Sequence, residues 1–295
     1  MKIGIALGSG SARGFSHIGV LEVLLENGII PTVVAGCSIG AIVGASYASG
    51  KLTYLKREAL SIHRFKWTQF FNPSLSFDRW INIKQMQLFL VRSGISRKKN
   101  IETLPISFGS VCCDLDTGKE IWSTKGNLFD SVWTSMAMPG VFPPVSRLSG
   151  GWVIDGGIVN PVPVSLCRSM GADIVIAVNL NADLLKQPTY KKSLKQKDTS
   201  TSLTRVFDKA KQLLPNHHHV ETPDFFSTVG RAINIAQDQI TKSRLAGDPP
   251  EILLNPRVAH IGLFETYRAR EAIEEGRKCA NRILPNILDL IKDNS

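Results

Sequence analysis

The stretch AGCSIGA, residues 35–41, places one serine between two glycines in a GxSxG frame formed by Gly36, Ser38 and Gly40. It follows the apolar run Val33–Ala35 and precedes Ile39–Ala48, whose apolar spacing is typical of a helix. A chain that turns directly from a strand into a helix adopts a strained conformation at the turn, and flanking glycines remove the clash. The small residues would therefore expose the Ser38 hydroxyl at a helix N-terminus, where developing negative charge is favoured.

By itself the GxSxG string is a weak signal, because glycine is common enough for it to occur by chance in about one chain in ten of this length. Its place between an apolar strand and an apolar helix is what makes Ser38 a candidate nucleophile.

Strands and helices alternate on both sides of this serine. Before it, the apolar run Ile3–Leu7 ends in glycines, and Ser16–Leu25 repeats apolar residues at helical spacing. This alternation favours an α/β fold with a mostly parallel sheet and ligands at the carboxyl ends of its strands. The later predicted elements are a hairpin of Ser107–Cys113 and Glu120–Trp122, a helix near Leu128–Met136, strands Trp152–Ile154 and Asp173–Asn179, a helix from about Pro223 to Leu245, a strand Ile252–Leu254 and a helix from about Glu265 to Leu284.

Length and composition favour a single domain over residues 1–295, since 43% hydrophobic residues can bury a sizeable core. Within it, residues 51–100 are a possible helical cap, and the polar, lysine-rich residues 182–220 predict a mobile insertion. The aromatic residues of the cap are Phe65, Trp67, Phe70 and Phe71.

The chain carries a formal net charge of +10, which suits an anionic partner surface such as phospholipid headgroups or nucleic acid. Much of this charge lies in one lysine-rich stretch, so a solvated loop is the plainer interpretation. No apolar run approaches the roughly 20 residues of a membrane span, and the start MKIGIALGSG is too short for a secretory signal. We therefore expect a cytoplasmic protein, whose five cysteines are reduced thiols rather than disulfides or a zinc site.

A serine nucleophile needs a base, and the residues alone leave two candidates open. His260, in AHIG after the strand Ile252–Leu254, has the place that a hydrolase triad requires, whereas His17 is expected to pack or cap a helix. Asp155, in GWVIDGGIVNPVP, ends a short apolar strand, although an Asp-Gly pair more commonly caps a turn.

The segment LGSGSARG, Leu7–Gly14, predicts an anion-binding turn ahead of a helix, because its glycines let successive backbone amides point into one space. One use of such a turn is dinucleotide binding, but the GxGxxG frame fails at Arg13 and no acidic residue closes the next strand. The other use is an oxyanion hole, whose donors lie about 3 Å from the oxygen that becomes charged.

Together these segments resemble the patatin-like phospholipases, above all short bacterial members of the RssA type. Gly36-Cys37-Ser38-Ile39-Gly40 resembles the family's serine elbow, and Asp155-Gly156-Gly157 resembles its aspartate motif. A further family pattern is similar to Ser135, Ala137 and Pro139. The glycine-rich oxyanion motif resembles Gly8, Ser9, Gly10, Ser11, Ala12, Arg13 and Gly14, with Ser9 and Ser11 where many members carry glycine.

The resemblance implies a three-layer α/β/α fold and a lipid acyl hydrolase with a serine–aspartate dyad and no histidine. Ser38 would attack the ester carbonyl, Asp155 would take its proton, and amides near Gly10 and Ser11 would hold the oxyanion. Arg13 would steady that loop or meet a phosphate. A phospholipid or lysophospholipid is the implied substrate class, no metal or organic cofactor is required, and nucleic acid is not expected as a partner.

Two rival functions remain. A histidine-based α/β-hydrolase esterase would pair Ser38 with His260, and a regulatory or scaffolding protein would keep the fold and bind a protein or lipid without turnover. The three intact motifs argue against the second rival.

A lipid substrate raises the question of membrane contact. The lysines within residues 186–211 and the aromatic group Phe65–Phe71 suggest weak docking on anionic bilayers, peripheral at the inner membrane face. A solvated loop and a cap packed into the core explain the same residues.

Overall fold

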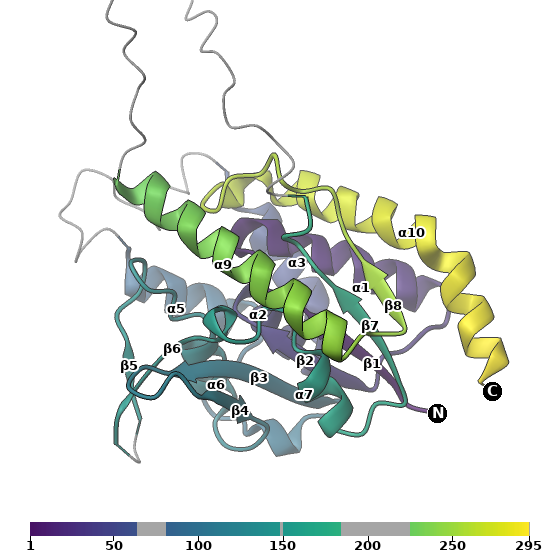
Figure 1. Ribbon diagram of the computed structural model, residues 1–295, viewed down its shortest axis with the longest axis horizontal. Helices are drawn as coiled ribbons and strands as arrows, with labels where there is room; N and C mark the ends of the chain where they lie inside the picture. Colours follow the sequence, from purple (N-terminus) through teal and green to yellow (C-terminus); the bar gives the residue numbers. More distant parts are fainter. Residues whose placement is uncertain (64–80, 148–149, 184–224, 295) are drawn as a thin grey trace, which may run out of the picture.

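The computed structural model describes residues 1–63, 81–147, 150–183 and 225–294 (Figure 1). Within these ranges an 8-stranded sheet forms the centre, in the order β5-β6-β3-β2-β1-β7-β8 with β4 beside β3. The strands are β1 (Ile3–Leu7), β2 (Val33–Cys37), β3 (Ser107–Asp114), β4 (Glu120–Ser123), β5 (Val145–Ser146), β6 (Trp152–Asp155), β7 (Ile174–Val178) and β8 (Ile252–Leu254).

The middle of the sheet is parallel and one side is antiparallel. β3, β2, β1, β7 and β8 are parallel to one another, whereas β4 and β6 pair antiparallel with β3, and β5 pairs antiparallel with β6. This arrangement confirms the predicted mostly parallel α/β sheet, and it confirms the β3–β4 hairpin. The carboxyl ends of β1 and β2 are neighbours, because Leu7 pairs with Gly36.

Helices cover both faces of the sheet, which gives the predicted three layers. The α-helices are α1 (Ser16–Glu26), α2 (Ile39–Ala48), α3 (Leu52–Leu60), α5 (Ile83–Arg92), α6 (Leu128–Ser135), α7 (Val164–Ser169), α9 (Phe225–Gly247) and α10 (Ala269–Asp293). Short 3₁₀ turns are η1 (Ser11–Phe15), η3 (Ile101–Thr103), η4 (Gly156–Ile158) and η6 (Thr266–Arg268).

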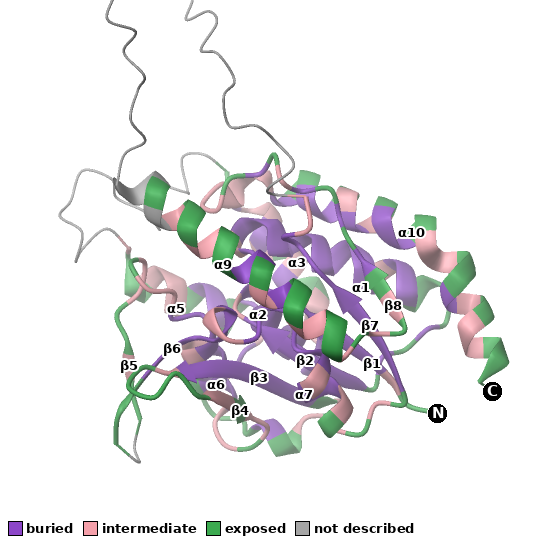
Figure 2. Ribbon diagram, viewed as in Figure 1, coloured by how far each residue is buried: buried purple, intermediate pink, exposed green. Residues whose placement is uncertain are grey.

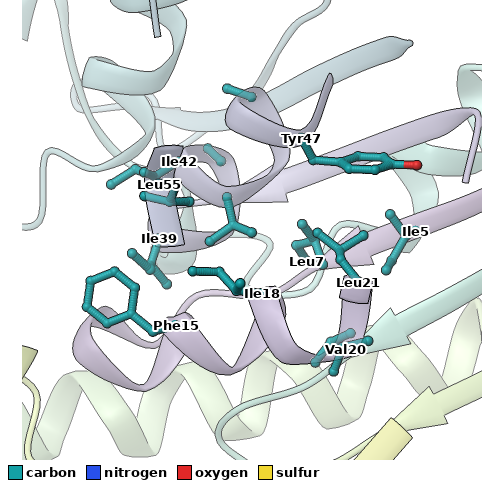
Figure 3. Packing of buried hydrophobic residues seen from close by; sticks show 14 of the residues in the cluster. Ile5, Leu7, Phe15, Ile18, Val20, Leu21, Ile39, Ile42, Tyr47 and Leu55 are labelled. Atoms are coloured by element: carbon teal, nitrogen blue, oxygen red, sulfur yellow. The ribbon is translucent and has the colours of Figure 1, made fainter. Parts of the chain in front are cut away.

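Alternation along β1 divides the core between the two faces. Ile5 and Leu7 point into a large cluster shared with α1, α2 and α10, and Ala6 points into a smaller cluster shared with α7. Figure 3 shows how side chains of α1 and α2 meet those of β1 in the large cluster. The central strands β1, β2, β3 and β7 are almost wholly buried, while β4 and β5 at one side of the sheet and the outer faces of α9 and α10 are more exposed (Figure 2).

The last helix is longer than the sequence predicts. We expected it to end near Leu284, but α10 continues through Pro285 to Asp293. The apolar pattern goes on beyond the proline, since Ile287 is buried and Ile291 packs against the core. This packing outweighs the hydrogen bond that proline removes from the helix.

Some predicted segments lie outside the described residues. They include the aromatic group at 65–71 and nearly all of the 182–220 insertion. Of the expected cap, residues 51–100, the structure describes α3 and α5 but not residues 64–80. The cap therefore remains a prediction, and so does the single-domain boundary.

Candidate active site

Ser38 occupies the turn between β2 and α2, with backbone angles φ 56° and ψ −120°. A positive φ on a residue with a side chain costs about 1–3 kcal/mol, and among the described residues other than glycine only Ser11 shares it. A Cβ on Gly36 would lie 2.5 Å from the carbonyl oxygen of Gly40, and one on Gly40 would collide with the backbone of Leu7. Both glycines of the frame are therefore required by close backbone contact.

The Ser38 hydroxyl donates a hydrogen bond of 2.6 Å to Oδ2 of Asp155. Asp155 ends β6, where it pairs with Cys112 of β3 and so lies beyond the carboxyl end of the neighbouring β2. Its other oxygen, Oδ1, accepts a 2.7 Å hydrogen bond from the amide of Gly157. The turn-capping role and the contact with Ser38 were alternatives from the sequence, and the structure gives Asp155 both contacts.

Burial changes the acidity of Asp155. The residue is 2% exposed, and loss of hydration raises the pKa of its carboxyl from 3.8 to about 6. The hydrogen bonds from Ser38 and from the Gly157 amide oppose this rise, because both favour the ionised carboxylate. An aspartate in this state is a stronger base than an exposed one and is still ionised at pH 7.

Ser135, at the end of α6, supports the backbone of the Ser38 turn. Its hydroxyl accepts a 2.9 Å hydrogen bond from the Ser38 amide, and the carbonyl of Ala137 accepts one from the Asp155 amide. The Ser135–Ala137 segment therefore fixes the backbones of both members of the pair. The sequence linked these residues to the site only through the family pattern.

In the glycine-rich loop, some backbone amides bond to neighbouring segments, and others have no backbone acceptor among the described residues. Gly8 donates to Val178, Ser9 to Pro161, and Ala12 to Leu263, each through the backbone. Between them, the amides of Gly10 and Ser11 have no backbone acceptor among the described residues. These are the two donors expected for an oxyanion, and both residues line pockets that include Ser38.

Other members of the loop pack rather than face the site. A Cβ on Gly14 would collide with the side chain of Ile39, so the loop lies directly on α2. Gly156, after the aspartate, lies equally close to the backbone of Val111.

A sequence profile of the patatin-like phospholipases matches residues 5–168, which contain the loop, the elbow and Asp155. The chain belongs to this family. An uncharacterised NTE family protein of Mycobacterium tuberculosis is 29% identical over 96% of this chain and 91% of the relative. The human patatin-like phospholipase domain-containing protein 6 is 32% identical over 65% of this chain, but only 14% of its own length is matched.

A solved structure shows a similar fold. VipD from Legionella pneumophila superposes with a TM-score of 0.51 at 14% identity, covering 97% of this chain and 67% of VipD. The family profile confirms the recognition of the family from the sequence, and with it the general class of lipid hydrolase.

Arg13 of the patatin-type loop points into the protein. The residue is 1% exposed, and its guanidinium donates to Oδ1 of Asn181 at 3.4 Å and Oδ1 of Asn234 at 3.2 Å. Burial lowers its pKa to about 10, while the charge of Asp183 acts in the opposite direction. Of the two expected roles, the contacts favour steadying the loop over meeting a phosphate.

The sequence did not predict three residues that form hydrogen bonds with the glycine-rich loop. Asn181 follows β7, and Asn234 and Gln237 lie on α9, where Gln237 accepts a 3.3 Å hydrogen bond from the Ser9 hydroxyl. The available signal was a row of polar residues on the inward face of α9, where Gln237, Asp238 and Thr241 are buried. A polar stripe at helical spacing facing a core predicts partners within that core.

The described histidines are engaged elsewhere. Nε2 of His260 lies 2.7 Å from Glu271 at the surface, and His63 contacts the carbonyl of Ser61. His17 is buried, with Nε2 2.8 Å from the Gly8 carbonyl, and burial lowers its pKa to about 4, so it is neutral and packs as expected. His217, His218 and His219 lie outside the described residues.

Ser38 lies between two cavities of different character. The larger has a volume of about 720 Å³, counting the part open to solvent, and its walls include Phe15, Ile42, Phe89 and Phe142. The smaller, of about 320 Å³, adjoins Asp155 and is lined by Gly10, Asn234 and Gln237 among others. Ser11, Ser38 and Met138 border both.

The described residues contain neither a cluster of metal ligands nor a helix suited to span a membrane. No group of three or more His, Cys, Asp or Glu side chains in them could hold a metal ion. Among the helices in the same part of the chain, none combines the length and apolar character needed to cross a bilayer.

Proposed function

We propose that this chain is a serine acyl hydrolase of lipid esters, similar in action to a phospholipase A or lysophospholipase, with Ser38 as nucleophile and Asp155 as base. The observation that carries this proposal is the 2.6 Å hydrogen bond from the Ser38 hydroxyl to Asp155, beside a large apolar cleft. The family supports lipid ester hydrolysis in general.

In the first step the Ser38 oxygen attacks the ester carbonyl carbon, and Asp155 takes the hydroxyl proton. The negative charge then lies on the former carbonyl oxygen, where the free amides of Gly10 and Ser11 would donate to it. Collapse of this intermediate breaks the bond to the leaving alcohol, which takes the proton from Asp155. An acyl group is left on Ser38.

The second step reverses the first with water as the nucleophile. Asp155 removes a proton from the water, hydroxide adds to the acyl carbon, and the Ser38 oxygen leaves with the proton that Asp155 returns. The products are a fatty acid and the free enzyme.

The two cavities suit the two halves of such a substrate. An acyl chain matches the apolar cleft lined by Phe15, Ile42, Phe89 and Phe142, because burying each methylene there contributes about 0.8 kcal/mol. The smaller cavity beside Asp155, with Asn234 and Gln237 in its wall, suits the leaving alcohol and the entering water.

The acidity of Asp155 sets the expected pH dependence. Since its pKa is raised to about 6, protonation removes the base below that pH. We expect kcat/KM to fall about tenfold per pH unit on the acid side of 6.

A fluorophosphonate probe tests the nucleophile directly, because it bonds covalently to an activated serine. We expect mass spectrometry to find the label on the peptide that contains Ser38, and Ser38→Ala to abolish both labelling and hydrolysis of a lysophospholipid. Labelling on Ser11, the other serine that borders both cavities, would overturn the assignment.

The histidine-based rival is separated by His260→Ala. We expect this variant to keep the wild-type rate, since His260 pairs with Glu271 at the surface. An inactive His260→Ala beside an active Asp155→Asn would favour the rival. A wild-type protein that binds lipid and does not react with the probe would instead favour a non-catalytic role.

A further inference from the structure

The α5 helix has two contrasting faces. Met86 and Phe89 point into the apolar cleft, and Leu90 is fully buried. On the opposite side, Ile83, Leu88 and Val91 are 36%, 47% and 44% exposed. Their angular positions on a helix fall within one half-turn together with those of Lys84 and Arg92. We call these five residues, Ile83, Lys84, Leu88, Val91 and Arg92, the α5 outer face.

The chain around this face is positively charged. Residues 81–100 contain no aspartate or glutamate, and their basic residues are all exposed. These basic residues are Lys84, Arg92, Arg97, Lys98 and Lys99. Apolar side chains flanked by basic ones are typical of a helix that lies in the interface of an anionic bilayer.

We propose that the α5 outer face docks on the surface of an anionic lipid bilayer and brings the mouth of the apolar cleft to the substrate. This rests on the proposed function, since a lipid substrate has to leave the bilayer to reach Ser38. The same helix forms part of the cleft wall through Met86 and Phe89. A docked α5 therefore places the apolar cleft next to the bilayer surface.

The apolar and the basic side chains of the α5 outer face contact different parts of the bilayer. Ile83, Leu88 and Val91 enter the boundary between headgroups and acyl chains, while Lys84 and Arg92 extend their charged ends to the phosphates. Each basic residue near such a surface strengthens binding about fivefold, and the attraction fades within a Debye length as salt rises. The docking is accordingly weak, reversible and sensitive to salt.

Charge argues against a second copy of this chain as the occupant. A two-fold interface would set the α5 outer face against itself, so Lys84 and Arg92 would meet the same cations of the other copy. With no acidic residue in 81–100 to compensate, that contact is repulsive. An anionic bilayer removes the repulsion.

The binding test is done on Ser38→Ala protein, so that turnover plays no part. Sedimentation with phosphatidylcholine vesicles containing about 30% phosphatidylglycerol measures the partition coefficient, with pure phosphatidylcholine as the neutral comparison. We expect Lys84→Gln/Arg92→Gln to weaken binding to the anionic vesicles about 25-fold. Leu88→Ser/Val91→Ser should weaken it at least tenfold.

The matched control is Lys278→Gln/Lys292→Gln, which removes the same charge from α10, a helix that ends on the other side of the view from α5 (Figure 1). This control should lose less than twofold. Equal binding to neutral vesicles, equal losses in the control, or no binding at low salt would each overturn the proposal. So would a change in oligomeric state of the α5 variants, measured by sedimentation velocity, without a change in vesicle binding.

A second measurement separates docking from catalysis, using the same α5 substitutions in active protein. Hydrolysis of a water-soluble short-chain ester should stay at the wild-type rate, because none of the substituted side chains lines the cleft. Hydrolysis of vesicle lipid should fall in parallel with binding. If the chain hydrolyses nothing, the proposed function fails, while vesicle binding still decides whether the α5 outer face docks.

Discussion

Two neighbouring turns of this molecule each contain a serine with a positive φ angle and use it differently. Ser11 follows β1 and Ser38 follows β2, and both have positive φ angles, 52° and 56°. Each begins a helical segment at the carboxyl end of its strand, η1 after β1 and α2 after β2. The strands are parallel neighbours, so both turns open at the same edge of the sheet.

The side chains show the difference. The hydroxyl of Ser38 faces Asp155, whereas that of Ser11 donates a 2.6 Å hydrogen bond to the carbonyl of Leu263. At Ser11 it is the backbone amide that has no backbone acceptor among the described residues. A serine with a positive φ therefore presents its side chain after β2 and its amide after β1, and the parallel pairing of the two strands places both groups at one edge of the sheet.

The largest expected effect concerns the Ser38 turn. We expect Ser38→Ala and Asp155→Asn each to lower kcat at least about 10³-fold, and the double variant to be little worse than either, because the two side chains act as one unit. Steady-state kinetics on a soluble ester measures this. Multiplicative losses in the double variant would show that Ser38 and Asp155 act independently.

A second prediction tests the contact between the two turns. Gly40→Ala puts a methyl group against the Leu7 backbone, so we expect a loss of about 3 kcal/mol in the free energy of unfolding and most of the activity. Denaturant unfolding measures the change. Gly247→Ala is the control, because its added Cβ meets nothing within 4 Å and a helix gains from alanine. Equal stability of Gly40→Ala and wild type would mean that the turns move apart freely.

A third prediction concerns the cost of burying the Asp155 carboxylate, the proposed base, next to Ser38. Asp155→Asn should raise the free energy of unfolding by about 2 kcal/mol at pH 8, since the neutral amide avoids burial of a charge. The folded pKa of Asp155 is about 6 against 3.8 for the ordinary carboxyl, so wild-type stability falls as pH rises between these values. The gain should therefore grow from pH 4 to pH 6 and level off above.

Thermal unfolding of both proteins across this pH range checks the prediction. A variant that is less stable at every pH would mean that the hydrogen bonds of the carboxylate outweigh its burial.

The sequence predicted the two segments of the candidate site that are formed by neighbouring residues, the Ser38 elbow and the glycine-rich loop. Glycine spacing and apolar runs gave the elbow and the loop, because backbone contacts such as that of Gly40 with Leu7 restrict the residue types at those positions. The family resemblance, rather than spacing, singled out Asp155 over His260. From the residues alone, Asp155 and His260 remain equal candidates for the base. Only the antiparallel pairing of β6 with β3 brings Asp155 to Ser38.

Contacts between distant segments could not be predicted. Gln237 meets Ser9 across 228 positions, and no local signal marks that pairing. The predicted end of the last helix near Leu284 was wrong for a related reason, since core packing of Ile287 continues the helix past Pro285. In both places tertiary contacts decide what the local pattern leaves open.

The smallest expected effect concerns the Ser11 turn, where only the amide should matter for the reaction. Ser11→Gly keeps that amide and accepts a φ of 52° without strain, but it loses the hydrogen bond to Leu263, worth about 1 kcal/mol. Strain relief and the lost bond offset each other, so we expect stability within about 0.5 kcal/mol of wild type and kcat within a few-fold. Ser11→Ala loses the same bond and keeps the strain, so it should be about 1 kcal/mol less stable, with kcat also little changed. Equal stability of the two variants would mean that the turn stores no strain, and a loss of kcat as large as that of Ser38→Ala would mean that the Ser11 hydroxyl takes part in the reaction.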